Sequence, residues 1–374
     1  MSFYDLKKQY GGFDFAGRMK SVTEKDVLRA LRSDAELSPE DFLALLSPTG
    51  GGYLEEAAQK ARRLTKLHFG NVVFMFTPLY LSNYCDSACP YCSFGRQQPI
   101  ARKQLSISEI RDEAAQINAS GIRHILFLTG ESRKSAPLSY LKEAVSALKK
   151  HFSFIGIEIY PMRTEEYAQL IQSGVDGLTL YQETYDEAAY AALHKGGPKA
   201  DYVFRLEAPE RALEAGMVSV NIGALLGLND PIRDSFFTAL HLRYLQDRFP
   251  AAELSISLPR LRPLVADFIP PSPVDDRLFV RILTAFRLFA PRAGITVSTR
   301  ESAGFRRAIL PMGVTRMSAG VCTSVGGRLK DPGVPQFEIA DTRSVKEIME
   351  ELSSMGYQPV LCDWSHALLR SREP

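Results

Sequence analysis

The sequence predicts an α/β protein, and within that class a (β/α)8 barrel of the TIM type with an N-terminal helical extension and a short C-terminal extension. Two observations support this prediction. First, eight short apolar segments that suit buried strands recur along the chain with helical segments between them, which is the pattern of parallel sheets joined by helical crossovers. Second, three of the five cysteines follow the first apolar segment, between Cys85 and Cys92, where a barrel places its functional residues.

Residues 1–70 are expected to form the N-terminal helical extension. Ser38, followed by Pro39 and Asp41, is typical of a helix start, because a serine side chain caps free N–H groups and proline suits the first turn. A second helix is expected over residues 53–68, before Gly70.

The expected barrel covers residues 71–325. Its first strand is the apolar run at 72–76, which suits a strand buried on both faces. The other strands are expected at 124–129, 154–160, 177–181, 218–222, 254–258, 295–299 and 314–318, with helices between them at, for example, 107–120, 138–150, 165–173 and 278–289. The last two strands have the weakest patterns, so a six-strand partial barrel is the alternative. Residues 326–374, with a helix at 344–355, are expected to pack on the barrel as the C-terminal extension.

The overall composition excludes several classes of partner. The 374 residues carry 45 basic and 43 acidic side chains, a net charge of +2, which gives no reason to expect nucleic acid or an anionic membrane. No apolar run approaches the roughly 20 residues of a membrane span, and the start of the chain lacks the apolar core of a signal peptide. We therefore expect a cytoplasmic protein.

The segment Cys85-Asp-Ser-Ala-Cys89-Pro-Tyr-Cys92 is the strongest candidate for chemistry. Thiolates select iron–sulfur clusters, zinc or Cu(I), and three close thiolates can bind three irons of a cubane cluster and leave the fourth open. A zinc site would need a fourth ligand, whereas Cys322 and Cys362 are single and distant. Three buried cysteines on one helix face are disfavoured by the internal proline, and disulfides are disfavoured by the odd thiol count.

This motif resembles the signature of the radical S-adenosylmethionine (SAM) superfamily. The resemblance implies that Cys85, Cys89 and Cys92 hold a [4Fe–4S] cluster whose fourth iron is chelated by SAM. It also implies that Tyr91 lies near the adenine, and that reductive cleavage of SAM yields a 5′-deoxyadenosyl radical.

Polar residues at the following strand ends extend the resemblance to SAM binding. Thr129-Gly130-Glu131 resembles the motif that binds the SAM amine, with threonine where the family has its first glycine; alone it could be an ordinary turn. Glu183 and Arg205 match residues that hold the ribose or amine and the carboxylate of SAM, or they could pair only with each other. The segment beginning at Asn221 resembles the one that packs on adenine, or is a glycine-rich turn.

Five residues near later strand ends and at the end of the first strand are candidates for the substrate. Arg260 and Arg262 suit an anionic substrate or a closing salt bridge. Arg300 and Ser318 are expected at the barrel mouth, where they would bind an amino-acid carboxylate, and Tyr80 would contact the amine or ring of the substrate. For each of them a purely structural role is an equal alternative.

A narrower resemblance is carried by motifs that occur in order over about residues 40–365. They include the segments 79–85, 128–131, 157–161, 174–186, 257–263, 318–320, 337–339 and 356–360, followed by Asp363-Trp364. Together they resemble the family of 2-iminoacetate synthases (ThiH), the tyrosine lyases of thiazole (thiamine) biosynthesis. This implies cleavage of the Cα–Cβ bond of L-tyrosine into 2-iminoacetate and p-cresol, with thiazole synthase (ThiG) as protein partner and flavodoxin or ferredoxin as reductant.

Three alternatives remain open at this point. The tyrosine lyase that matures the di-iron hydrogenase resembles the barrel but carries a second cluster, for which this sequence offers no further Cys-x2-Cys pair. A tryptophan lyase or a biotin-synthase-like enzyme would need a different substrate pocket. A non-catalytic metal-binding barrel is disfavoured by the intact cysteine triplet together with Glu131, Glu183 and Arg205.

Overall fold

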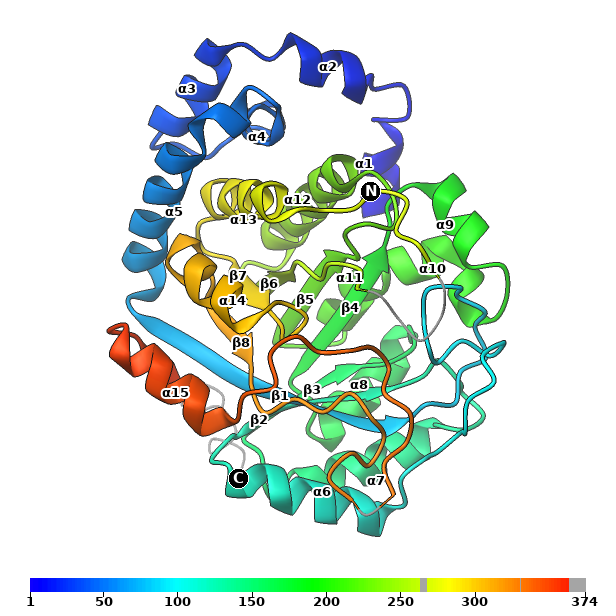
Figure 1. Cartoon of the computed structure of the whole chain (residues 1–374). Coiled ribbons are helices and arrows are strands. Elements are labelled where there is room, and N and C mark those ends of the chain that lie inside the picture. Colours follow the sequence, from blue (N-terminus) through cyan, green and yellow to red (C-terminus); the bar gives the residue numbers. More distant parts are fainter. Residues whose placement is uncertain (263–267, 330, 363–374) are drawn as a thin grey trace.

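The computed structural model describes residues 1–262, 268–329 and 331–362. Its centre is a closed barrel of eight parallel strands, because β1 pairs with both β2 and β8 (Figure 1). The strands are β1 (Val72–Ser82), β2 (His124–Thr129), β3 (Phe154–Glu158), β4 (Gly177–Glu183), β5 (Ser219–Ala224), β6 (Glu253–Ser257), β7 (Gly294–Val297) and β8 (Arg316–Ser318). The (β/α)8 barrel is confirmed, and the six-strand alternative is wrong.

Helices cover the outside of the barrel. They are α6 (Ile107–Ala119), α7 (Leu138–Leu148), α8 (Thr164–Ser173), α9 (Glu187–Leu193), α10 (Tyr202–Leu206), α11 (Ala208–Glu214), α12 (Pro231–Arg248), α13 (Asp276–Phe289) and α14 (Ala303–Ile309), with 3-10 turns η2 (Pro198–Ala200) and η3 (Leu310–Met312). The helix expected at 107–120 is α6, which begins with a capping box between Ser106 and Glu109. Helix α12 has no clear pattern in the sequence, because it is buried on most of its sides and so lacks a continuous polar face.

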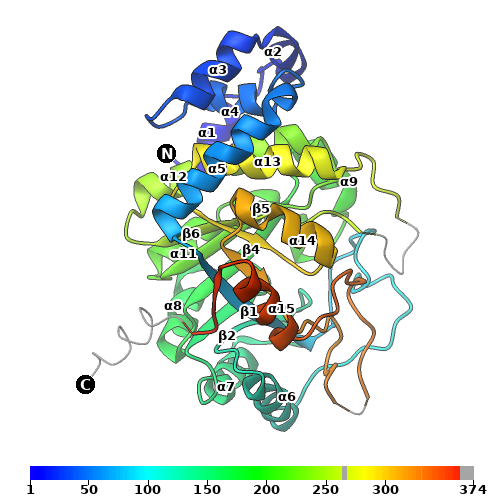
Figure 2. The ribbon, with the colours of Figure 1, turned by 60° about the vertical axis from the view of Figure 1, so that its left-hand side comes forward.

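The N-terminal helices lie against the outer face of this ring. They are α1 (Phe3–Lys8), α2 (Phe15–Ser21), α3 (Glu24–Arg32), α4 (Pro39–Leu46), η1 (Gly50–Tyr53) and α5 (Leu54–Phe69). Figure 2 shows α5 crossing α13, which it contacts, and α4 also contacts α13 and α12. Two arginines of α13 bind this extension, since Arg281 donates to the carbonyl of Ser47 and Arg277 to that of Gly51. The expected helix start at Ser38 is confirmed by its capping box with Asp41.

The C-terminal part returns to the first strand. After β8 the chain crosses the barrel mouth and then forms α15 (Val345–Ser354) and β9 (Gln358–Val360). β9 pairs in parallel with the beginning of β1, from Val72 to Phe74. Pro263, Asp363 and Trp364 of the sequence motifs lie outside the described residues. Among the described residues, no helix has the length and apolar character of a membrane span.

The barrel interior is partly hollow. A typical TIM barrel fills its axis with bulky branched side chains, whereas here many of the inward-facing positions are small or polar. They include Gly156, Gly177, Thr179, Ser219, Asn221, Ser257 and Thr296, all of which line one cavity along the axis. The fold therefore provides an internal space directly beneath the loop that follows β1.

Candidate active site

The three-cysteine segment is an irregular loop after β1, which excludes the helix-face alternative. The backbone N–H of Asp86 donates to the carbonyl of Glu131 at 3.0 Å, which ties the loop to the end of β2. Gly130 allows this approach, because a Cβ there would lie 2.3 Å from the carbonyl oxygen of Tyr84. On the other side, a Cβ on Gly197 would lie 2.4 Å from the carbonyl oxygen of Asp86. Close backbone contacts at Gly130 and Gly197 thus fix the position of the loop on both sides.

All five cysteines lie in the described part of the chain and are free thiols there. Burial raises the pKa of the Cys85 thiol to about 11 and that of Cys89 to about 12. Thiols in this setting stay protonated unless a bound cation compensates the thiolate charge, as iron does. In the described part of the chain, no three His, Cys, Asp or Glu side chains are grouped around the position of a single metal ion. The donor set fits a multi-iron cluster, in which each thiolate binds a different iron.

Four charged side chains form a buried cluster beside the cysteine loop. Arg205 lies 2.7 Å from Glu131 and 3.5 Å from Glu183, and Lys199 lies 2.5 Å from Glu183 and 3.8 Å from Glu131. Burial alone would raise the pKa of Glu183, but Lys199 and Arg205 lower it below its ordinary value. Glu131, Glu183 and Arg205 were expected here. Lys199 was not, because it follows no strand and belongs to no motif.

Two features of this charged cluster suit a ligand. Glu183 has a φ of 70°, the one positive φ of a non-glycine residue among those described, at a register shift near the end of β4. Such strained conformations concentrate at functional sites. Oε2 of Glu131 and the hydroxyl of Thr129 are buried without a hydrogen-bond partner, so both are unused acceptors.

Tyr91 packs in a small apolar cluster with Leu225 and Leu228, next to Cys89. Its hydroxyl lies 2.7 Å from Nε2 of His194, whose Nδ1 lies 2.8 Å from the carbonyl oxygen of Tyr190. Nδ1 therefore carries the proton, and Nε2 accepts from the tyrosine hydroxyl. This arrangement fixes the ring that was expected near the adenine.

Asn221 lies deeper than this apolar cluster. It faces the barrel cavity, where its amide nitrogen donates to the Ser257 hydroxyl at 2.7 Å and its Oδ1 has no partner. Two residues of the same segment, Leu225 and Leu228, pack beside Tyr91, and of these two Leu225 also lines the cavity. The geometry thus favours Leu225 over Asn221 for a contact with adenine.

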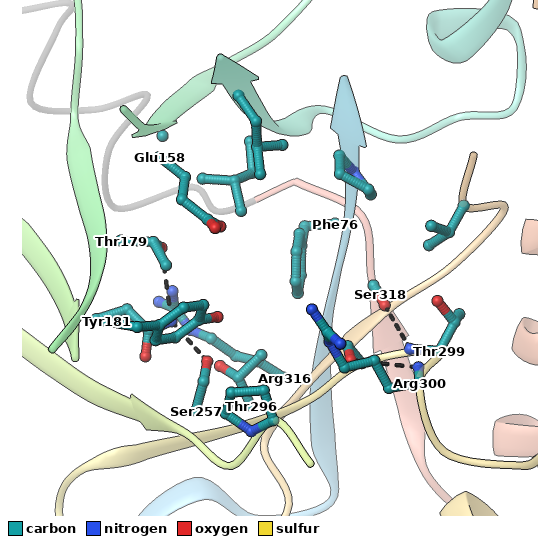
Figure 3. A pocket seen from close by; sticks show the side chains of 18 of the residues that line it. Phe76, Glu158, Thr179, Tyr181, Ser257, Thr296, Thr299, Arg300, Arg316 and Ser318 are labelled. Atoms are coloured by element: carbon teal, nitrogen blue, oxygen red, sulfur yellow. Dashed lines mark hydrogen bonds between the residues drawn. The ribbon is translucent and has the colours of Figure 1, made fainter. Parts of the chain in front are cut away.

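The barrel cavity has a volume of about 190 Å³ and opens beneath Cys92. Tyr80, Arg300 and Ser318, which were expected to meet the substrate, all line it (Figure 3 shows the last two). The Arg300 side chain stacks on Phe337, with 3.5 Å from the guanidinium carbon to the ring centroid. Among the described residues its guanidinium makes no hydrogen bond or ion pair, so it is available to a carboxylate.

The contacts of Arg260 and Arg262 are not those expected of residues that bind the substrate. Both pair with the buried carboxylate of Glu301, and Arg260 also lies 2.7 Å from Asp276. Neither lines the cavity. The structure therefore supports the closing salt bridge, and the sequence-based expectation that these two arginines bind substrate does not agree with their contacts.

Gln336 connects the C-terminal part of the chain to the cysteine loop. The hydroxyl of Tyr80 donates to its Oε1 at 2.8 Å, and its Nε2 lies 3.9 Å from Sγ of Cys92. Sequence reasoning missed Gln336 because it follows no strand, and its position depends on how the segment after β8 crosses the barrel mouth.

Glu158, the last residue of β3, was also missed. Its side chain extends into the cavity (Figure 3) and makes no hydrogen bond or ion pair among the described residues. Burial raises the pKa of this carboxyl to about 7, with a smaller contribution from Glu183 in the same direction. The signal in the sequence was a single carboxylate at a strand end, in the segment Ile157-Glu-Ile-Tyr-Pro161.

A parallel barrel with a three-cysteine loop after β1 and a buried charged cluster at the next strand ends defines the class of radical SAM enzymes. The model of the Radical SAM superfamily matches residues 79–238, and that of the Biotin and Thiamin Synthesis associated domain matches residues 257–358.

Whole-chain relatives narrow the class. The chain is 40% identical over 374 residues to "2-iminoacetate synthase" of Escherichia coli (strain K12) and 39% identical to that of Salmonella typhimurium, covering 100% of this chain and 99% of each relative. A crystal structure of HydG, "a maturase of the [FeFe]-hydrogenase", is similar with a TM-score of 0.90 and 31% identity, over 95% of this chain and 80% of that one. The chain belongs to the 2-iminoacetate synthase family of radical SAM enzymes.

Proposed function

We propose that this chain cleaves the Cα–Cβ bond of L-tyrosine to give 2-iminoacetate and p-cresol for the thiazole of thiamine. The observation that carries the proposal is the cavity beneath the cysteine loop, which contains Arg300, an arginine that pairs with no carboxylate of the described residues. An amino acid fits this arrangement, because a guanidinium binds a carboxylate through paired hydrogen bonds. The family supplies the choice of tyrosine.

Residues on one side of the cavity would hold the cofactors. Cys85, Cys89 and Cys92 would bind a [4Fe–4S] cluster. SAM would lie along the charged cluster and the apolar cluster, with its charged methionyl part near Glu131, Glu183, Lys199 and Arg205 and its adenine near Tyr91 and Leu225. When bound, the two together supply a 5′-deoxyadenosyl radical by one-electron reduction of SAM.

The other residues of the site orient the substrate and exclude water. Arg300 and Ser318 would hold the carboxylate of tyrosine, and Tyr80 would lie beside the amino group, where hydrogen abstraction is expected. The interior of the barrel would enclose the aromatic ring. Enclosure limits side reactions of a radical and fixes the reacting atoms near each other.

The product suggests a partner. The imine of 2-iminoacetate hydrolyses readily in water, so direct transfer to thiazole synthase (ThiG) would protect it. Flavodoxin or ferredoxin is the proposed source of the electron.

An anaerobic assay tests the proposal. The reconstituted, reduced protein is mixed with SAM and tyrosine, and the products are identified by liquid chromatography and mass spectrometry. We expect p-cresol, 5′-deoxyadenosine and glyoxylate, the hydrolysis product of 2-iminoacetate. Deoxyadenosine without p-cresol would refute tyrosine as substrate, and the absence of both from a cluster-loaded protein would refute the lyase.

The similarity to HydG makes a maturase the second candidate, because the two chains share the barrel over most of their lengths. A maturase of that kind would release cyanide and carbon monoxide as well as p-cresol. We expect neither gas in the assay.

A further inference from the structure

We propose that Glu158 binds the α-ammonium group of the substrate opposite Arg300, and accepts its proton before hydrogen is abstracted. The inference deepens the proposed function, on which it rests for the identity of the substrate. It assigns a role to the one carboxylate on the inward face of β3.

The position of Glu158 in the barrel is the first argument. Glu158 ends β3, and Arg300 follows β7. In the closed order of eight strands, β3 and β7 are four strands apart in both directions, so the two residues start from opposite walls. Both side chains line the same cavity (Figure 3).

The second argument is that the side chains of Glu158 and Arg300 have no polar partner among the described residues. A half-buried carboxylate and a half-buried guanidinium each lose hydration, and proteins usually compensate this by pairing them. Here neither group makes a hydrogen bond or ion pair among the described residues, and they do not pair with each other. Two opposite charges that are held apart across a cavity match a dipolar ion, with its carboxylate at Arg300 and its ammonium at Glu158.

The charged groups around Glu158 support the proton transfer. Burial raises its pKa to about 7, Glu183 acts in the same direction, and Arg300, Lys199 and Arg205 lower it by smaller amounts. The hydroxyls of Tyr80 and Tyr181 also face it, and burial keeps both protonated by raising their pKa values.

In water an ammonium does not give its proton to a carboxylate, because the carboxylic acid is much the stronger acid. Burial raises the pKa of the Glu158 carboxyl, and a nearby guanidinium lowers the pKa of the ammonium. Both effects bring the two pKa values closer together. The N–H bond of the ammonium breaks, an O–H bond forms on Glu158, and the electron pair stays on nitrogen. The step moves one proton, involves no oxidation or reduction, and leaves the amine that the proposed abstraction requires.

Equilibrium binding to the cluster-loaded, unreduced protein with SAM tests the inference without turnover. The ligands are tyrosine and 3-(4-hydroxyphenyl)propionate, which lacks only the amino group, and their dissociation constants are measured by anaerobic calorimetry. Glu158→Gln is expected to weaken tyrosine binding by about tenfold to a hundredfold, as for loss of a charged hydrogen bond, and to leave the propionate unchanged. Glu165→Gln, an exposed carboxylate on α8, is the matched control and should change neither constant.

The pH dependence gives an independent readout. Glu158 must be ionised to receive the ammonium, so the affinity of the wild-type protein for tyrosine should fall about tenfold per pH unit below pH 7. Glu158→Gln should remove this slope, and Glu158→Asp should restore it. A wild-type affinity that does not change between pH 5.5 and pH 8 overturns the inference even if the glutamine variant does not fold.

Other outcomes separate this inference from related ones. If Glu158→Gln weakens the binding of tyrosine and of the propionate equally, but not that of phenylalanine, the carboxylate contacts the phenol and the inference is wrong. If tyrosine binding is unchanged in Glu158→Gln while the wild type forms p-cresol, the role proposed for Glu158 is wrong and the proposed lyase activity stands. If Glu158→Gln weakens the binding of tyrosine but not of the propionate, and the wild type forms no p-cresol, the role of Glu158 is supported and the proposed lyase activity is wrong.

Discussion

Replacing Arg300 by glutamine should separate substrate binding from SAM cleavage. In the structure its guanidinium faces the cavity, stacks on Phe337 and makes no hydrogen bond or ion pair among the described residues, so the variant loses a cation that only a ligand would use. Hydrogen bonds to charged groups contribute about 1.5–3 kcal/mol, which corresponds to a loss of about tenfold to 150-fold in tyrosine affinity.

The assay compares p-cresol with 5′-deoxyadenosine over a range of tyrosine concentrations. Arg300 makes none of the ion pairs of the Glu131, Glu183, Lys199 and Arg205 cluster. Uncoupled formation of 5′-deoxyadenosine should therefore persist in Arg300→Gln, while half-saturation by tyrosine moves to higher concentration.

The matched control is Arg262→Gln. Arg262 pairs with Glu301 outside the cavity, so this change should leave the tyrosine dependence within about threefold, in line with the small contribution of partly exposed ion pairs. Equal loss of both products in Arg300→Gln would show that Arg300 supports the SAM site. A larger effect of Arg262→Gln than of Arg300→Gln would restore Arg262 to the substrate site.

Three further changes test the cysteine loop. Cys89→Ala should abolish the visible absorption and iron content of the reconstituted protein, together with 5′-deoxyadenosine formation, because a cluster held by three thiolates loses one of them. Gln336→Leu should make the cluster potential more negative in a redox titration followed by electron paramagnetic resonance, since it removes an N–H donor from Cys92. Gly130→Ala should lower the free energy of unfolding by about 1–3 kcal/mol in denaturant titrations, because its Cβ would overlap the Tyr84 carbonyl.

Each of these changes has a control in the same chain. Cys362 is far along the sequence from the cysteine loop, so Cys362→Ala should keep the cluster. Gln169 is exposed, so Gln169→Leu should leave the cluster potential unchanged. Gly52→Ala has no heavy atom within 4 Å of its new Cβ and should keep the stability. Normal iron in Cys89→Ala, an unchanged potential in Gln336→Leu, or full stability in Gly130→Ala would contradict the contact on which that prediction depends.

The strands and the cysteine loop were predictable because local sequence determines both. The run from Val72 to Phe76 is apolar throughout, which is typical of a strand covered on both faces, so this strand is recognisable without knowledge of the fold. The loop was predictable because Pro90 and the close cysteines restrict both its conformation and its chemistry. The helix α12 was less visible, since burial on most of its sides removes the polar face that marks a helix.

The site was predictable only as far as motifs extend. Arg260 and Arg300 both follow strands, and only the fold shows that Glu301 neutralises the first while the second faces the cavity. Lys199 and Gln336 reach the site from segments without strand ends. Their roles depend on distant backbone positions, which a single sequence does not encode in any short pattern.

The pairing of β9 with β1 joins two segments that are far apart in the sequence. Asn71, just before β1, donates to the carbonyl of Gly356, 285 residues away, and the three residues of β9 then pair with the start of β1. A chain emerging from the ribosome cannot complete this edge until β9 has been synthesised. Bringing together residues so far apart costs more chain entropy than a local contact does, so the start of β1 gains this support only when β9 docks. Truncation of the chain before α15 should therefore loosen the start of β1 and impair cluster retention, although neither α15 nor β9 contains a cysteine.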